Sequence, residues 1–256
     1  MELDEYRHAL NFTYDYQLAA GPQRVDVVII KKAKDIPIRK NIAAIFRKVN
    51  LLEYKSPECY VSVKDFYRVY GYACQYIQLE DNKGTEISDL TLTFVESRYP
   101  GGLIRHLTEQ RNFTVEESHP GIYSVRGDII PIQIIDSRRL SAEENFWLKD
   151  LDNCLTALQI KRLAEEIWRL GNAAGIAAYI DAIMKANPKS VEEMYKMSEG
   201  TLTLDEVFVR VGAAARWEAK GKEEVARNML KSGFSVEQIA ALSGLDAEKI
   251  RALADD

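Results

Sequence analysis

Three charged residues lie in stretches that otherwise have the composition of β-strands. Asp26 falls in a run rich in Val and Ile, and Glu53 and Lys55 fall in a second apolar run that begins at Val49. Because side chains alternate between the two faces of a strand, Glu53 and Lys55 point to one face and Tyr54 points to the other. If the two strands are neighbours, Asp26 joins them in one small polar site. Two carboxylates and an ammonium group suit a hard divalent cation beside a phosphate.

The overall composition excludes several other kinds of protein. The chain has 256 residues, 46 % of them hydrophobic, and a formal net charge of −5, so it can bury a core but has no general attraction for nucleic acid. The three cysteines and three histidines lack the spacing of a zinc site or a disulfide framework. No apolar run approaches the length of a membrane span, and the acidic start does not resemble a signal peptide. We expect a soluble, cytoplasmic protein with no membrane contact.

The first part of the chain has the mixed pattern of an α/β protein. Residues 11–18 alternate aromatic and polar side chains, a Gly-Pro turn follows, and residues 24–31 continue as a strand, which predicts a hairpin. Residues 37–48 fit either a helix or a loop that packs on the core. The strand that carries Glu53 follows this stretch and ends at Ser56-Pro57.

A helix is predicted to begin near Ser62, which can form a capping box with Asp65. We expect its buried stripe to contain Val63, Phe66, Tyr67, Tyr70, Cys74 and Ile77. The later patterns predict strands at 90–95, 113–115 and 129–135 and a helix at 101–112.

Strand signals stop after Ser141, and helical periodicity continues to the end of the chain. Ser190 with Glu193, and Ser235 with Gln238, are candidate helix caps. The expected organisation is a first domain at 1–140, a helical region at 141–232 and a C-terminal helical hairpin at 233–256.

The order of strand, connection, Glu-x-Lys strand and helix resembles the PD-(D/E)xK nuclease fold. Longer segments look like its recombination-promoting nuclease and transposase-like (Rpn-like) branch, namely residues 24–32, 45–48, 51–57, 72–74, 91–99 and 234–240. The resemblance covers most of the chain. It implies an α/β (α+β) restriction-endonuclease-like fold, in which a mixed sheet with flanking helices precedes an all-helical C-terminal region.

The resemblance also implies metal-dependent cleavage of phosphodiester bonds in DNA, associated with transposition or recombination. Asp26, Glu53 and the backbone carbonyl of Tyr54 would bind Mg²⁺ or Mn²⁺, and Lys55 would hold the attacking hydroxide and the scissile phosphate. The chain departs from the family pattern in having Val25 before the aspartate instead of proline.

A second departure lies at the N-terminus. Relatives usually carry a fuller helix before the hairpin, and that helix often brings another acid toward the metal, whereas only about ten residues precede the first strand of this chain. Glu2 or Glu5 could take that part, and the spacing selects neither.

A basic cluster between the two candidate catalytic strands is the predicted DNA-contacting surface. It consists of Lys31, Lys32, Lys34, Arg39, Lys40, Arg47 and Lys48, extended on the next helix by Lys64 and Arg68. The same residues also fit a solvated charged face that binds nothing.

The C-terminal segment from Phe234 to Leu253 resembles a minimal helix-turn-helix with Ile239, Ala240, Leu245 and Ile250 as its core. A helical hairpin that packs on the preceding long helix fits it better than a DNA-reading unit, because its last helix carries few basic residues. Two further readings of the whole chain therefore stay open beside the endonuclease. One is a catalytically degenerate interaction or DNA-binding module, and the other is a transcriptional regulator led by this hairpin. A homodimer would suit cleavage of both strands of a duplex.

Overall fold

The structure is a computed structural model that describes residues 2–13, 27–33, 36–79, 82–170, 176–197, 204–210 and 213–254. Asp26 and Lys34, two of the predicted site residues, lie outside the described residues. The chain divides into two compact units, Met1–Cys154 and Leu155–Asp256. The finer three-part organisation expected from the sequence stays a prediction.

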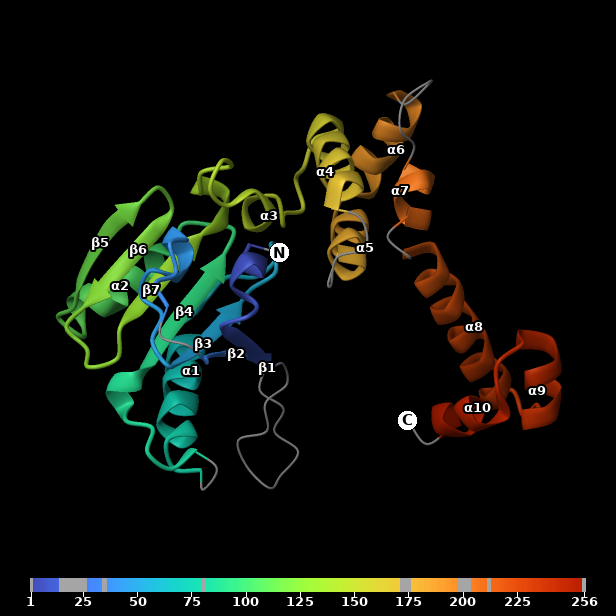
Figure 1. Ribbon diagram of the computed structural model, residues 1–256, viewed down its shortest axis with the longest axis horizontal. Coiled ribbons are helices and arrows are strands. Elements are labelled where there is room, and N and C mark those ends of the chain that lie inside the picture. Colours follow the sequence, from blue (N-terminus) through green and yellow to red (C-terminus); the bar gives the residue numbers. More distant parts are fainter. Residues whose placement is uncertain are drawn as a thin grey trace. The chain divides into compact units, whose positions relative to one another are not determined.

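The first unit is built on a mixed sheet (Figure 1). The strands in its described part run in the spatial order β1-β2-β3-β4-β7-β6-β5. Their bounds are β1 Leu10–Thr13, β2 Val27–Lys32, β3 Val49–Tyr54, β4 Leu90–Glu96, β5 Thr114–His119, β6 Ile122–Arg126 and β7 Ile132–Asp136. The central strands β3, β4 and β7 are parallel, and the outer pairs are antiparallel. This mixed sheet, together with its helices, confirms the predicted fold class.

The predicted hairpin is present as far as the structure describes it. β1 and β2 pair antiparallel, with Leu10 opposite Lys32, and β2 pairs antiparallel with β3, with Val27 opposite Glu53. Residues 37–48, all of them described, form a packed loop and not a helix, because their one regular element is a short 3₁₀ turn at Asn41–Ala43. Ile42 of that turn is buried against the sheet.

The helix predicted after β3 is α1 (Val63–Tyr76), and its capping box is as expected. The Ser62 hydroxyl accepts from the backbone N–H of Asp65, and the Asp65 carboxylate accepts from the backbone N–H of Ser62. The predicted buried stripe is partly wrong: the core positions are Phe66, Val69, Ala73 and Tyr76. Their spacing follows one face of the helix, and this face excludes Tyr67, which is exposed and contacts His106 instead.

The helices α1 and α2 (Gly101–Glu109) cover one face of the sheet. Their buried side chains form one core with the inward-facing residues of the strands, for example Leu51, Leu92, Phe94 and Ile132. Burying such aliphatic and aromatic side chains contributes about 1.5–3 kcal/mol each to folding. This core holds α1 against the strand ends on which the charged residues lie.

The opposite face is covered by loops and short turns instead of long helices. Ile42, Val95, Ile135 and Leu140 form its core, and α3 (Phe146–Lys149) lies in the connecting segment. Glu2 accepts hydrogen bonds from the backbone N–H groups of Trp147 and Leu148 at the start of α3, where the positive end of the helix stabilises an acid.

The second unit is helical in its described part, as predicted for the C-terminal region. Its helices are α4 Ala157–Leu170, α5 Ile176–Ala186, α6 Pro188–Met197, α7 Leu204–Arg210, α8 Ala213–Lys231, α9 Val236–Ser243 and α10 Ala247–Ala254. The cap expected from Ser190 and Glu193 is wrong, because α6 begins at Pro188, a first helical position that favours proline, and Ser190 therefore lies inside the first turn. None of the described helices is both long and apolar enough to cross a membrane.

The last three helices form a small core of their own. Ala226 of α8, Ile239 of α9 and Ile250 of α10 are fully buried against one another, and Ala240 and Leu245 pack at the edge. The predicted core residues of this segment are therefore confirmed. Ser235 and Gln238 form the expected capping box, and Gly244 ends α9 in the left-handed conformation that glycine adopts without strain.

Candidate active site at the carboxyl edge of the sheet

The parallel strands bring charged residues together where they end. Glu53 lies opposite Phe94, and two positions further along Glu96 lies directly opposite Asp136. The ring of Phe94 contacts Phe66 of α1, and alternation places Glu53, Lys55 and Glu96 on the same, α1-covered face. The sheet thus collects acids of β3, β4 and β7 at one edge.

Two acids and two bases form a closed ion cluster at this edge. Lys55 Nζ lies 2.8 Å from Glu53 Oε1 and 3.0 Å from Asp65 Oδ1. Arg68 Nη2 lies 2.7 Å from the same Glu53 oxygen and 3.0 Å from the same Asp65 oxygen. We call Glu53, Lys55, Asp65 and Arg68 the ion cluster. Its formal charges sum to zero, although Glu53 is only 1 % exposed.

Within the part of the chain that the structure describes, three carboxylates at this edge each keep one buried oxygen without a hydrogen-bond partner. These atoms are Glu53 Oε2, Glu96 Oε1 and Asp136 Oδ1. Leaving a buried polar atom unpaired costs about 1–3 kcal/mol, so such atoms are expected where a ligand completes the site. The unpaired oxygen of Glu53 could coordinate a hard divalent cation such as Mg²⁺, which prefers oxygen ligands.

In the part of the chain that the structure describes, no three His, Cys, Asp or Glu side chains gather closely enough to hold a metal ion by themselves. Magnesium does not need such a cage, because it is usually held by one or two carboxylates together with water and substrate phosphate. Glu53 therefore fits one ligand position, and Asp26, the second carboxylate expected from the sequence, lies outside the described residues.

The acids at this edge have different pKa values because their surroundings differ. Burial acts to raise the pKa of Asp65, but hydrogen bonds from Ser62 and Lys55 outweigh it and lower the pKa to about 2. Burial raises the pKa of Glu96 to about 7, opposed by the N–H of Val61 and reinforced by Asp136. Burial also raises the pKa of Asp136. The edge thus combines a strongly ionised acid with two that retain protons more readily.

Lys55 is held in its charged form. Burial acts to lower the pKa of Lys55, but hydrogen bonds to Glu53 and Asp65 outweigh it and raise the pKa. The ammonium group is therefore a permanent positive point charge at neutral pH.

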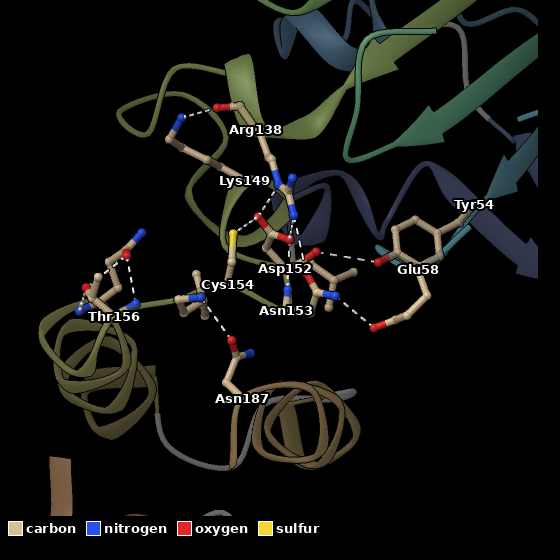
Figure 2. A network of polar contacts seen from close by, with 12 residues as sticks. Tyr54, Glu58, Arg138, Lys149, Asp152, Asn153, Cys154, Thr156 and Asn187 are labelled. Atoms are coloured by element: carbon tan, nitrogen blue, oxygen red, sulfur yellow. Dashed lines mark hydrogen bonds and ion pairs between the residues drawn. The ribbon is translucent and has the colours of Figure 1, made fainter. Parts of the chain in front are cut away.

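Tyr54 anchors the strand end from the opposite face. Figure 2 shows its ring directed toward the segment that contains Asp152 and Asn153. That segment is held by Arg138, which contacts the two Asp152 oxygens at 2.6 and 2.8 Å, and by Asn153, which donates to Glu58 at 2.9 Å. Burial, followed by the charges of Asp152 and Glu58, raises the pKa of Tyr54 to about 12. Fixing Tyr54 on this face orients its neighbours Glu53 and Lys55 toward α1.

A cleft of about 440 Å³ opens between the end of β4 and the start of α2. Glu96 is among its lining residues, together with residues 60–63 and 98–103. The size falls in the range of small-ligand sites, which is about 300–1,000 Å³.

Most of the residues predicted to contact DNA lie away from the ion cluster. Lys31 lies opposite Val49 and Lys32 opposite Leu10, so the antiparallel course of β2 and β3 puts these lysines at the other end of β3, about 13 Å or more from Glu53 along the strand. Arg47 and Lys48 lie just before β3 at that same end, where Arg47 donates to the Ser88 carbonyl and Lys48 pairs with Asp89 at 2.8 Å.

Other predicted positions lie under the opposite face or on α1. The backbone N–H of Arg39 donates to the Tyr6 hydroxyl, and Lys40 pairs with Glu2 at 3.1 Å. Glu2, one of the two acids considered for the metal, is therefore engaged at α3 and Lys40. Lys64 is exposed on α1, one turn before Arg68 of the ion cluster.

Sequence reasoning did not assign a site role to Asp65, Glu96 or Asp136. The sequence predicts Asp65 only as part of a helix cap, and in the structure the same carboxylate serves both the cap and the ion cluster. A usable signal exists for the other two: each apolar strand ends with an acid followed by serine, Glu96-Ser97 and Asp136-Ser137. An acid that directly follows a buried parallel strand lies at the edge where α/β proteins bind ligands.

Comparison with known protein families gives a match at the C-terminal end of the chain. Residues 220–255 match the family model described as "Rpn/YhgA-like nuclease family, C-terminal HTH domain". These residues span the end of α8 together with α9 and α10, the helices that share the Ile239–Ile250 core. No curated protein and no solved structure matches the chain. The match confirms the resemblance to the Rpn-like family and supports a relationship to nucleases.

Proposed function

We propose that this chain, whose last helices match the C-terminal domain of an Rpn/YhgA-like nuclease family, is a metal-dependent endonuclease that hydrolyses phosphodiester bonds in DNA. The observation that carries the proposal is the position of Glu53. Its carboxylate is buried at the edge of the sheet, with one oxygen between Lys55 and Arg68 and the other oxygen unpaired.

The metal-binding residues in this proposal are Glu53, Asp26 and the backbone carbonyl of Tyr54, which supply the oxygen ligands that Mg²⁺ or Mn²⁺ prefers. A bound divalent cation acidifies water and neutralises charge that develops on a phosphate. Val27, the residue after Asp26, lies opposite Glu53 in the β2–β3 register. Residues that lie opposite one another in an antiparallel pair share a face of the sheet, so this register alone does not bring Asp26 to Glu53; Asp26 lies outside the described residues and enters the proposal from the sequence resemblance.

Lys55 is the residue that handles the reacting groups. Its ammonium group lies between Glu53 and Asp65 and stays charged at neutral pH. A rigidly held positive charge can orient a nucleophilic oxygen and stabilise negative charge on the phosphate. Arg68 adds a second donor group on the same side, and a guanidinium binds phosphate oxygens through two parallel hydrogen bonds.

Cleavage of supercoiled plasmid by the purified chain tests this function. We expect nicked or linear product in Mg²⁺ or Mn²⁺ and none after EDTA is added. The variants Glu53→Gln and Asp26→Asn should both be inactive, and Glu143→Gln, an exposed acid distant from the ion cluster in sequence, serves as the matched control. If Glu53→Gln and Asp26→Asn both cleave plasmid as fast as the wild type does, the proposal is refuted.

A second function is favoured by one specific observation. Lys55 and Arg68 already neutralise Glu53 and Asp65 in a closed cluster, which is the arrangement expected if the acids have only a structural task. The chain would then be a catalytically degenerate DNA-binding module. Isothermal titration with Mn²⁺ separates the two functions, because only the endonuclease requires cation binding that is lost in Glu53→Gln.

A further inference from the structure

The cleft beside β4 contains two exposed aromatic rings. Tyr60 and Tyr99 both line it, and they are 67 % and 57 % exposed. The Tyr99 ring is held by an edge contact with Tyr123, at 5.6 Å between centroids. It also lies close to the backbone of Gly101, where an added Cβ would come within 3.3 Å of the ring. Large exposed aromatic side chains at a cleft offer stacking surfaces for flat ligands.

Glu96 lines the same cleft and is almost fully buried, with 1 % of its surface exposed. One carboxyl oxygen accepts from the backbone N–H of Val61 at 3.1 Å, so the side chain is fixed in direction. The other oxygen has no hydrogen-bond partner among the described residues. A buried, oriented and incompletely paired carboxyl group favours a ligand that offers hydrogen-bonding groups to it.

The start of α2 adds donors to the cleft. The first intrahelical bond of α2 runs from Ile104 N–H to the Pro100 carbonyl, and no side chain caps the helix. The N–H groups of Gly102 and Leu103 precede that bond and lie at the positive end of a nine-residue helix. A Cβ added at Gly102 would meet nothing within 4 Å, so its backbone is open to a ligand. Arg98, also exposed and lining the cleft, supplies a positive charge.

We propose that this cleft is a nucleotide subsite that holds one unstacked nucleotide of a single-stranded or distorted DNA substrate. The base stacks on Tyr60 and Tyr99 and forms hydrogen bonds with Glu96 through its edge. The phosphate is held by Arg98 and the N–H groups at the start of α2. This inference rests on the proposed function and deepens it, because it assigns a substrate class: DNA with an unpaired or flipped nucleotide beside the cleavage site.

The chemistry of the cleft distinguishes a nucleotide from a phosphate alone. A site for phosphate alone needs only donors and positive charge, and it would gain nothing from a buried carboxyl group or from two aromatic rings. A nucleotide uses all three features, since bases carry amino or imino donors, ring nitrogen or carbonyl acceptors, and a flat π-face. The three features meet in one cleft of suitable size.

The test measures binding of the four deoxyribonucleoside 5′-monophosphates to the full chain in EDTA, by isothermal titration. Deoxyribose 5-phosphate and inorganic phosphate are the base-free comparisons. We expect at least one nucleotide to bind about tenfold or more tightly than deoxyribose 5-phosphate, as base stacking on aromatic rings predicts. Tyr60→Leu should weaken that nucleotide about tenfold and leave deoxyribose 5-phosphate unchanged.

Two further variants separate the parts of the subsite. Arg98→Gln should weaken the nucleotide and deoxyribose 5-phosphate by the same factor, because it removes a phosphate contact. Arg105→Gln, on the same helix α2 but outside the cleft lining, is the matched control and should bind as the wild type does. Glu96→Gln preserves an acceptor for the Val61 N–H, so the fold is retained, and it should change the ranking of the four bases.

Failure of this inference is distinguishable from failure of the proposed function. Nucleotides that bind no better than deoxyribose 5-phosphate, or a Tyr60→Leu variant with wild-type nucleotide affinity, would overturn the subsite even if plasmid is cleaved. Base-dependent binding that is lost in Tyr60→Leu supports the subsite even if no cleavage is found.

Discussion

Glu53 and Arg68 are fifteen residues apart in the chain, and their charged atoms lie 2.7 Å apart. The contact joins the end of β3 to the second turn of α1, over the carboxyl edge of the sheet. Since Lys55 contacts the same Glu53 oxygen, this oxygen has two charged partners, whereas the other oxygen has no hydrogen-bond partner among the described residues. Because both charged partners contact one Glu53 oxygen, replacing Arg68 or Lys55 tests what each contributes to stability, cation binding and cleavage.

We expect Arg68→Met to lower the free energy of unfolding by about 1–2 kcal/mol, because it removes a charged hydrogen bond to a buried acid. The expected loss of unfolding free energy is at the low end for a hydrogen bond to a charged group, because the Arg68 side chain is 38 % exposed and water partly screens its charge. The same variant should bind Mn²⁺ more tightly, since a competing cation leaves Glu53. Urea unfolding and isothermal titration measure the two effects.

The control for this prediction is Lys64→Met on the same helix. Lys64 is exposed, and its replacement should change stability by less than about 0.5 kcal/mol. An Arg68→Met variant as stable as this control would show that the ion cluster contributes little to the fold.

Lys55→Met should reduce the rate of plasmid cleavage by about 100-fold or more, because removing one positioned donor from a reacting centre has an effect of that order. Lys55→Arg keeps the charge but replaces a compact ammonium with a planar fork, so it should restore only part of the rate. Mn²⁺ affinity and urea unfolding are measured in parallel to exclude loss of the site. A fully active, folded Lys55→Met variant would remove Lys55 from the mechanism.

The raised pKa of Glu96 predicts a pH dependence of stability. The pKa is about 7 in the folded chain, against an ordinary value of 4.5 for glutamate. The stability associated with the protonated group is therefore fully present below about pH 4.5 and is lost as the pH rises through about 7. The loss amounts to about 3 kcal/mol at most. Urea unfolding from pH 4 to pH 8 should show this decline in the wild type.

Glu96→Gln cannot ionise and should flatten the decline, so the variant becomes more stable than the wild type above pH 7. Asp136 also has a raised pKa and faces Glu96, whereas Asp65 has a lowered pKa and loses its contribution only as the pH falls toward 2. The difference between variant and wild type therefore isolates Glu96. Parallel stability curves would contradict the buried, proton-retaining state of this group.

The position of basic residues predicts an unequal effect on DNA binding. Lys64 lies on α1 beside the ion cluster, whereas Lys48 lies at the far end of β3 and is paired with Asp89. Lys64→Ala should weaken binding of the full chain to DNA and lower the salt dependence of binding by about one phosphate contact. Lys48→Ala, the matched control, should have little effect. Filter binding at several salt concentrations measures both, and the reverse ranking would place DNA at the opposite end of the sheet.

Local patterns in the sequence were enough to predict much of the fold. The alternation in β1 and β3, the Ser62–Asp65 capping box and the Ser235–Gln238 capping box depend on residues close together in the chain. Such interactions are decided by neighbours, and single-sequence reasoning can identify them. The predicted stripe of α1 is partly wrong because Phe66 and Tyr67 are adjacent aromatic residues, and only packing in the folded protein decides which of them is buried.

The sequence by itself determined the types of residues that can do chemistry here, the Glu53-Tyr54-Lys55 alternation and the change from mixed to helical structure. Only the tertiary structure decided that Asp65 and Arg68 close an ion cluster on Glu53 and that Glu96 lies opposite Asp136. It also decided that Lys31, Lys32, Arg47 and Lys48 of the basic cluster lie at the other end of β3 from Glu53. The physical reason is that strand order, strand direction and register arise from burial summed over the whole sheet. No local stretch of sequence contains that sum.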